Sequence, residues 1–195
     1  KYLPNIEVLQ PEKASDETFI EKLKSYNADL FVVVAYGQIL KQKLLDLPKH
    51  DCINIHASLL PKYRGAAPIH RSIINGDAKT GITIMKMVKK MDAGDIIKQK
   101  SLDIDDMNFE QLESKLCSVS CDLIYEVIKE YKKGDVSSIP QDESLVSFAP
   151  KIQIDDTEID WNQNAKKIHD QIRAFSLRPS ARCFVDINGN KKSLK

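Results

Sequence analysis

The chain has 195 residues, of which 42% are hydrophobic and 29% are charged, a balance typical of a soluble globular protein. No apolar run approaches the roughly 20 residues that span a bilayer, so membrane insertion is not expected. Twenty-nine basic and 28 acidic side chains leave a formal charge of +1, so the bulk charge does not indicate a nucleic-acid binder, and such a role would need local patches.

The four cysteines are scattered, without the spacing of a zinc site or the density of a disulfide scaffold, which favours a reducing compartment. Cys117 and Cys121 lie four residues apart on a predicted helix, where they could hold a metal or pack as small apolar side chains. No third ligand lies nearby in the sequence, which favours packing. We therefore expect no metal site.

The first third of the chain alternates predicted strands with predicted helices. The continuous β-branched and aromatic run at 30–34 has no polar alternation, which is typical of a central parallel strand buried on both faces. Before it, Ser15 or Asp16 begins a helix whose apolar residues recur at helical spacing. The predicted order is strand, helix, strand, helix, strand, over residues 6–9, 16–26, 30–34, 41–47 and 52–55.

The next part of the chain contains a helix, two strands and the longest helix. Pro68 begins the first helix, and strands follow over 81–87 and 95–104. Asn108 and Gln111 form a capping-box pair that begins the longest helix, which carries a single apolar stripe. Alternating strands and helices of this kind predict an α/β fold built on an open, mostly parallel sheet.

The composition changes after the longest helix. Residues 135–156 are rich in Ser, Pro, Gln and Asp, which indicates a connecting segment, and an amphipathic helix follows it. We expect a first domain, a linker and the start of a carboxy-terminal domain, over 1–136, 137–156 and 157–195 respectively. Because the chain begins at Lys1 without a methionine, we also expect a fragment that lacks its first strands, so that the strand at 30–34 has an uncovered apolar edge.

Ligands bind open α/β sheets beyond the carboxyl ends of the strands, so the polar residues at those ends are the candidates for chemistry. Asn54 and His56 are two residues apart on a predicted strand, hence on one face, where the chain leaves the sheet. An amide donor beside an imidazole suits an oxyanion that forms during acyl transfer, although such a short pair taken alone is more often structural. Asp92, shortly before Gly94, would by itself be interpreted as a turn residue.

The residues around these candidates resemble a known family. The block Asn-Ile-His-Ala-Ser-Leu-Leu-Pro-Lys-Tyr-Arg-Gly at 54–65 resembles the signature of the folate-dependent formyltransferases. The segment Met-Asp-Ala-Gly-Asp at 91–95 stands where that family carries its catalytic aspartate. Similarity to the branch of the family that acts on methionyl-tRNA is carried by residues 34–40, 66–69, 74–77 and 80–85.

The resemblance implies a Rossmann-like formyltransferase sheet and transfer of a formyl group from 10-formyltetrahydrofolate to the amino group of initiator methionyl-tRNA. It implies that Asn54 and His56 meet the developing oxyanion, and that Asp92 makes His56 the stronger donor and relays a proton through water. The residues that it places on the folate side are Gly37, Gln38, Ile39, Leu40, Ser58, Leu59, Leu60 and Pro61.

The resemblance also implies the partners, which are initiator methionyl-tRNA and folate. As above, we expect no membrane partner and no metal. We expect a monomer in the cytoplasm, with an organelle left open. Lys62 and Arg64 could meet the folate glutamate tail or tRNA phosphate, or could simply be solvated. His70 and His169, on predicted helices, are expected to be surface or packing residues.

Two other functions stay open. A formyltransferase that acts on a sugar-nucleotide amine would use the same Asn, His and Asp with a similar loop. A folate-binding module without chemistry, or a hydrolase domain that releases formate from the same carrier, would belong to another class. The presence of all three polar residues argues against a module that has lost its chemistry.

Overall fold

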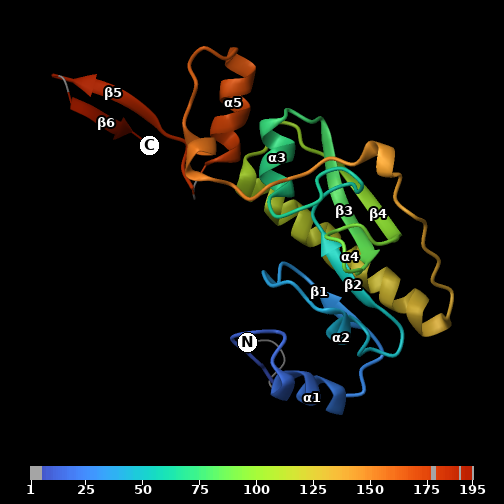
Figure 1. Cartoon of the computed structure of the whole chain (residues 1–195). Helices are drawn as coiled ribbons and strands as arrows, with labels where there is room; N and C mark the ends of the chain where they lie inside the picture. Colours follow the sequence, from blue (N-terminus) through green and yellow to red (C-terminus); the bar gives the residue numbers. More distant parts are fainter. Residues whose placement is uncertain (1–5, 177–178, 189, 195) are drawn as a thin grey trace.

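A mixed sheet of four strands forms the centre of the computed structural model, which describes residues 6–176, 179–188 and 190–194. Its strands are β1 (Phe31–Val33), β2 (Cys52–His56), β3 (Lys79–Lys86) and β4 (Ile96–Asp103). The helices are α1 (Glu17–Ser25), α2 (Gln42–Leu45), α3 (Pro68–Ile74), α4 (Phe109–Lys133) and α5 (Ala165–Ala174), with 3₁₀ turns η1 (Glu143–Leu145) and η2 (Ile154–Thr157). A separate hairpin of β5 (Cys183–Ile187) and β6 (Asn190–Leu194) projects from the carboxy-terminal part (Figure 1).

The four strands lie in the order β1-β2-β3-β4. β1 pairs with β2 in parallel, with Val33 opposite Asn54, whereas the pairs β2–β3 and β3–β4 are antiparallel. The predicted α/β class is confirmed, but the described sheet is mixed rather than mostly parallel. One physical reason is the connection from β3 to β4, which is too short for the crossover that parallel strands need.

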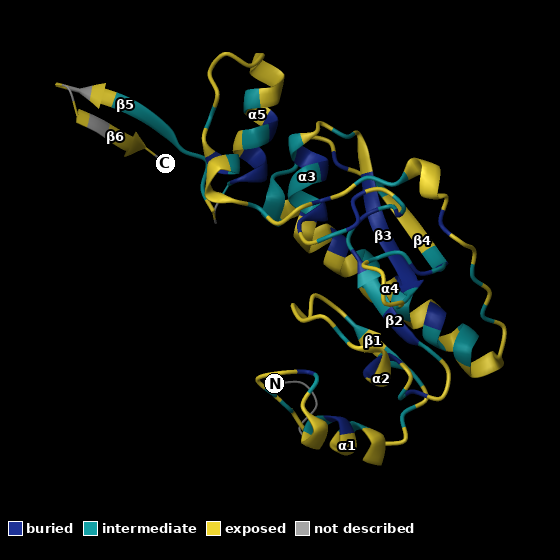
Figure 2. Ribbon diagram, viewed as in Figure 1, coloured by how far each residue is buried: buried dark blue, intermediate teal, exposed yellow. Residues whose placement is uncertain are grey.

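One face of the sheet packs against the long helix α4. Alternate residues of β2 and β3 form one core with the apolar stripe of α4. Figure 2 shows much of β3 as buried. The predicted capping box is present, because Asn108 accepts from the backbone N–H of Gln111 and Gln111 accepts from that of Asn108. The buried members of this core are Ile53, Ile73, Ile82, Ile84, Ile104, Leu112, Leu116, Leu123, Val127 and Ala174.

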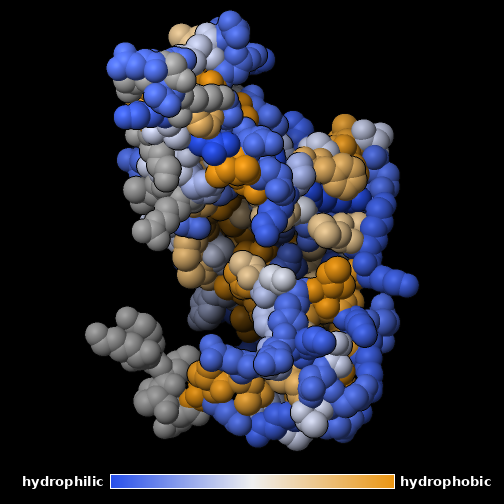
Figure 3. Space-filling model, turned by 60° about the vertical axis from the view of Figure 1, so that its left-hand side comes forward, coloured by the Kyte–Doolittle hydropathy of each residue, from blue (hydrophilic) through white to orange (hydrophobic). Residues whose placement is uncertain are grey.

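β1 is the poorly covered edge of the described sheet. Val32 and Val34 are 42% and 57% exposed, so the predicted burial of this strand on both faces is wrong for the described residues. Residues 6–9, predicted as a strand, form no strand and give β1 no second neighbour. The uncovered apolar edge expected beside 30–34 is therefore present, and Figure 3 shows apolar surface around the recess in the middle of the molecule.

The segment predicted as a linker packs along the molecule instead of standing free. Within it, Ile139 forms an isolated β-bridge with Ile96 of β4. Beyond it, α5 packs on α3, and the buried Arg173 of α5 donates a hydrogen bond to the carbonyl of Met107 at 2.6 Å. The segment thus contacts the sheet before the chain reaches α5, while the domain boundaries themselves stay a prediction.

An ion pair joins α3 to η2 and makes the stability of this junction dependent on pH. Both Nη atoms of Arg71 donate to the carboxylate of Asp156, at 2.9 and 2.8 Å, and this contact lowers the pKa of Asp156 from its ordinary value of 3.8. Because the folded pKa lies below the unfolded one, the pair stabilises the fold above a pH of about 3.8, and that stability is lost as the pH falls through the folded pKa.

We expect Asp156→Asn to lower the free energy of unfolding at neutral pH. This effect should shrink as the pH falls below about 3.8 and should be lost once the pH is below the folded pKa of Asp156. Urea denaturation of the wild-type and variant chains at both pH values measures it. If the wild-type chain and the variant differ in the free energy of unfolding by the same amount at neutral and acid pH, the ion pair is not the cause of the lost stability.

Candidate active site

β2 presents Asn54 and His56 on one face, at the end where the chain leaves the sheet. Ile53, which alternates with them, lies in the core against α4, so the pair faces the other side of the sheet. On the neighbouring strand β3, Met85 lies opposite Asn54 and Thr83 lies opposite His56. The two side chains therefore stand on the face that α4 does not cover.

His56 lies between a carbonyl and a carboxylate. Its Nε2 is 2.8 Å from the carbonyl oxygen of Tyr63, and its Nδ1 is 3.8 Å from Oδ2 of Asp92. A carbonyl oxygen can only accept, so Nε2 carries a hydrogen and donates it, and Nδ1 is the nitrogen that can gain or lose a proton. Because the residue is only 6% exposed, these neighbours fix the orientation of the ring.

Asp92 lies in the turn between β3 and β4, with a φ of 48° in the left-handed region that Asp tolerates better than most residues. Its Oδ2 accepts a hydrogen bond from the backbone N–H of Gly65 at 2.8 Å. This bond connects the β3–β4 turn with the loop that follows β2. The structure thereby brings Asp92 beside His56, two of the residues that the sequence singled out.

Asn54 is half-buried, and its side-chain amide forms no hydrogen bond with another residue of the described chain. An amide offers two N–H donors and one oxygen acceptor. With no protein partner among the described residues and with part of its surface accessible, this amide is available to a ligand.

The loop after β2 contains four of the residues expected on the folate side, and it faces partly inward. Ser58 is fully buried, and its hydroxyl donates to the carbonyl of Lys62 at 2.6 Å. Leu60 is 3% exposed and packs on the sheet. Leu59 and Pro61 are half-buried, so they retain accessible surface.

The other four folate-side candidates, residues 37–40, follow β1. Because β1 runs parallel to β2, both loops leave the sheet at the same edge. Gln38 is tied to the amino-terminal segment, since its Oε1 accepts from the N–H of Ala14 at 2.8 Å and its Nε2 donates to the carbonyl of Glu12 at 3.2 Å. Ile39 is 84% exposed. This loop is thus anchored by one side chain and otherwise open.

A buried residue that the sequence did not single out, Gln141, lies against this site. It comes from the segment predicted as a linker, and it contacts both Arg64 and the turn that carries Asp92. No local sequence signal marks it, because a Gln in a polar segment is ordinarily solvated.

Arg64 is 1% exposed, and its guanidinium binds Gln141 and Glu143. The expectation that Arg64 meets a folate tail or tRNA phosphate is therefore wrong, because its buried guanidinium is bound by Gln141 and Glu143. Lys62, the other residue of that expectation, is exposed.

Other polar residues stand apart from this site. His70 packs against Phe109 with ring centroids 4.1 Å apart, and burial lowers the pKa of its imidazole. Cys117 and Cys121 are exposed on α4, so their predicted packing in the core is wrong.

Within the described part of the chain, no group of three or more His, Cys, Asp or Glu side chains is placed to hold a metal ion. None of the described helices has the length and apolar character that crossing a bilayer requires.

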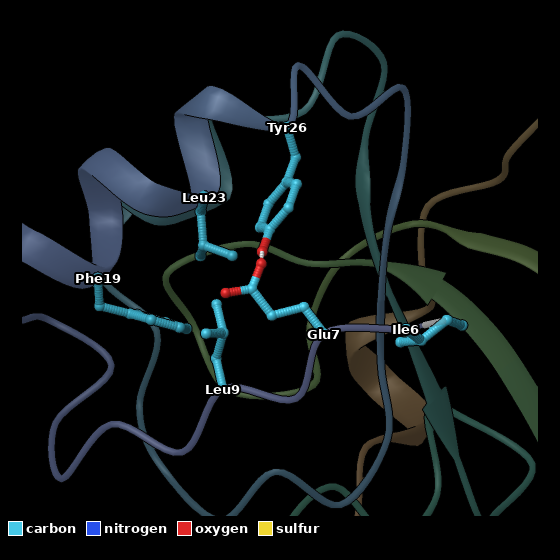
Figure 4. A pocket seen from close by; sticks show the side chains of 6 residues that line it. All are labelled: Ile6, Glu7, Leu9, Phe19, Leu23 and Tyr26. Carbon is cyan, nitrogen blue, oxygen red and sulfur yellow. Dashed lines mark hydrogen bonds between the residues drawn. The ribbon is translucent and has the colours of Figure 1, made fainter. Parts of the chain in front are cut away.

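Two open hollows lie beside α1, away from His56 and Asp92. One has a volume of about 520 Å³, and Tyr26 donates a hydrogen bond to Glu7 within it at 2.5 Å (Figure 4). Its lining consists of Ile6, Glu7, Leu9, Phe19, Leu23 and Tyr26. Neither hollow contains a predicted site residue, so the polar geometry on β2, rather than hollow size, indicates the site.

Comparison with known proteins identifies the family. A family model described as formyl transferase matches residues 3–128, and one described as the carboxy-terminal domain of formyl transferase matches residues 151–195. The chain belongs to the formyl transferase family. The first match includes the part of this formyl transferase chain that holds Asn54, His56 and Asp92.

Three similar proteins show how far the likeness extends. The chain is 54% identical over 192 residues to methionyl-tRNA formyltransferase of Protochlamydia amoebophila. This match covers 98% of this chain and 60% of that protein. A 4-N formyltransferase from Francisella tularensis is 26% identical with a TM-score of 0.72, over 90% of this chain and 74% of that one. HypX from Aquifex aeolicus in complex with tetrahydrofolic acid is 18% identical with a TM-score of 0.75, over 88% of this chain and 30% of that one, and shares the fold. The chain spans less than two thirds of the length of the curated relatives that it matches.

Proposed function

We propose that this chain carries the catalytic centre that transfers the formyl group of 10-formyltetrahydrofolate to the amino group of initiator methionyl-tRNA. The observation that carries the proposal is the approach of Asp92 to His56, within 3.8 Å, on the sheet face that also presents Asn54. Sequence identity supports methionyl-tRNA as the acceptor in this proposal, because the chain is 54% identical to a methionyl-tRNA formyltransferase and 26% identical to the 4-N formyltransferase.

In the proposed reaction the amine nitrogen forms a bond to the formyl carbon, and the bond from that carbon to N10 of the folate breaks. The attacking nitrogen loses a proton, and N10 gains one. Asn54, whose amide is free of partners in the described chain, donates to the formyl oxygen as that oxygen becomes negative. His56 supplies a second donor at Nδ1 when that nitrogen is protonated, because Nε2 is already bound to Tyr63.

In the proposed mechanism, Asp92 accepts the proton that the amine releases. Its Oδ2 is bound by the N–H of Gly65, whereas its Oδ1 forms no hydrogen bond with another described residue. Oδ1 can therefore take the proton through a water molecule, and Oδ2 faces Nδ1 of His56. One carboxylate thus orients the imidazole and serves as the proton acceptor.

The folate side of the proposed site lies where the loops after β1 and β2 meet the same sheet edge. Leu59 and Pro61, with residues 37–40, retain surface for a planar pteridine and backbone groups for its polar edge. Ser58 and Leu60 support this loop from inside. HypX from Aquifex aeolicus, which shares this fold, is known in complex with tetrahydrofolic acid, and this supports a folate site in the proposal.

A formylation assay with two acceptors tests the proposal. The chain, and a version extended with the segments of the Protochlamydia amoebophila relative that lie outside the match, are incubated with 10-formyltetrahydrofolate and either methionyl-tRNA or a sugar-nucleotide amine. We expect formyl-methionyl-tRNA from the extended version, with less from the shorter chain, whose charge of +1 attracts tRNA phosphate weakly. Transfer to the sugar alone, release of formate alone, or binding of folate without either would each replace the proposed function by the corresponding alternative.

A further inference from the structure

Gln141 connects three segments of the site through one buried amide. Its Oε1 accepts hydrogen bonds from Nε and Nη2 of Arg64, at 3.0 and 2.8 Å. Its Nε2 donates to the backbone carbonyls of Asp92 and Gly94, each at 2.8 Å. The segment after α4, the loop after β2 and the β3–β4 turn are thereby joined at a side chain that is 9% exposed.

The chemistry of the partners fixes the orientation of this amide. A guanidinium can only donate and a carbonyl can only accept, so the reversed amide would lose all four contacts. Arg64 is itself held by Glu143 at 2.8 Å, and Glu143 also pairs with Lys90 of the β3–β4 turn at 2.8 Å. The hydrogen bond from Arg64, followed by that from Lys90, lowers the pKa of Glu143 to about 2, so this second connection persists over the pH range in which proteins work.

Apart from Gln141, the β3–β4 turn is held by the hydrogen bond from Gly65 to the Asp92 carboxylate, by the pair of Lys90 with Glu143 and by backbone pairing at its base, while its tip is exposed. Met91 is 64% exposed, and Lys89 and Lys90 are exposed. Without the Gln141 donors, the carbonyls of Asp92 and Gly94 would be left unpaired in a partly buried place, which favours movement of the turn.

We infer that Gln141, oriented by Arg64, is a positioning residue that sets the place of Asp92 relative to His56. The inference rests on the proposed function for its catalytic consequence, because Asp92 matters to the rate only if Asp92 takes part in the reaction. Its structural part, the dependence of the contact between Asp92 and His56 on Gln141, can be measured on this chain without any turnover.

Two substitutions separate the contacts of Gln141. Gln141→Glu keeps an acceptor for Arg64 but has no donor for the two carbonyls, so the buried arginine remains paired while the turn is released. Gln141→Met keeps similar volume without charge and removes all the hydrogen bonds. Gln163→Glu is the matched control, because Gln163 is exposed and its amide binds Asp160, away from the site.

The readout is the ¹⁵N signal of His56 Nδ1 in histidine-labelled chains, with and without Asp92→Asn. In the wild-type chain and in the control, we expect Asp92→Asn to change this signal. In either Gln141 variant, Asp92→Asn should change the His56 signal much less, because Asp92 has already moved away from His56. Since the signals with and without Asp92→Asn are compared within one Gln141 variant, the direct effect of the Gln141→Glu charge on His56 cancels. A change of full size in both Gln141 variants would overturn the inference.

Formyl transfer then separates the inference from the proposed function. In the extended chain we expect Gln141→Glu to lower kcat by up to about a hundredfold with little change in the KM for 10-formyltetrahydrofolate, since a misplacement of about 1 Å has such a cost. An equal rise in KM with unchanged kcat would indicate a role in folate binding and would contradict positioning. If the His56 signals respond as expected but Asp92→Asn transfers formyl groups normally, the positioning inference stands and the proposed function fails.

Discussion

Asp92→Asn is expected to lower kcat for formyl transfer by roughly 10²- to 10⁴-fold, the range typical of a lost acid–base group, while folate binding stays near the wild-type level. An Asn side chain is nearly the same shape, and its oxygen can still accept the hydrogen bond from Gly65. It cannot accept the proton of the attacking amine. The substitution therefore removes the charge and the proton acceptor while the turn keeps its hydrogen bond.

Steady-state kinetics with methionyl-tRNA, together with calorimetry of folate binding, measures both parts of this expectation in the extended chain. Asp95→Asn is the matched control, because it removes the same charge three residues along the chain at a side chain with no hydrogen bond to another described residue. Normal turnover by Asp92→Asn would exclude Asp92 from the mechanism. Loss of folate binding instead would place Asp92 in the binding of the donor.

Features encoded by neighbouring residues could be predicted from the sequence. Three features each depend on a few adjacent residues, and the structure contains all three: the capping pair of Asn108 and Gln111, the start of α1 at Ser15 or Asp16, and the placement of Asn54 with His56 on one strand face. For α1 the capping residue is Asp16. The contact between Asp92 and His56 could not be predicted from neighbouring residues. Its local sequence predicts only a turn residue at Asp92, and only the resemblance to a family indicates that Asp92 lies beside His56.

Features that depend on distant contacts were missed. Gln141 binds a residue 77 positions earlier and a carbonyl 49 positions earlier, and composition gave its segment the character of a free linker. For the same reason Arg64 was interpreted as a surface cation, although it is buried against that segment. The continuous apolar run at 30–34 predicted burial on both faces, but burial of a strand depends on its neighbours, and β1 has one described neighbour.

Gly94→Ala is expected to disrupt the same turn from its other end. A Cβ at Gly94 would lie 1.8 Å from the carbonyl oxygen of Lys86, far inside contact distance, and that oxygen belongs to the backbone. No side-chain rotation can relieve this clash, so the turn that carries Asp92 must move away from β3. We expect a loss of about 3 kcal/mol in the free energy of unfolding and a fall of about a hundredfold or more in kcat.

Gly134→Ala provides the matched control for this glycine. Gly134 ends α4 with a φ of 75° and has open space around its Cβ position, so alanine there introduces backbone strain without a clash, at about 1 kcal/mol. Urea denaturation and formyl-transfer kinetics of the two variants separate a general loss of stability from displacement of the turn. Because Gly94 also offers its carbonyl to Gln141, moving it should weaken the contact that positions Asp92 as well as the turn itself. Wild-type turnover by Gly94→Ala would show that the place of Asp92 does not depend on the close approach of the turn to β3.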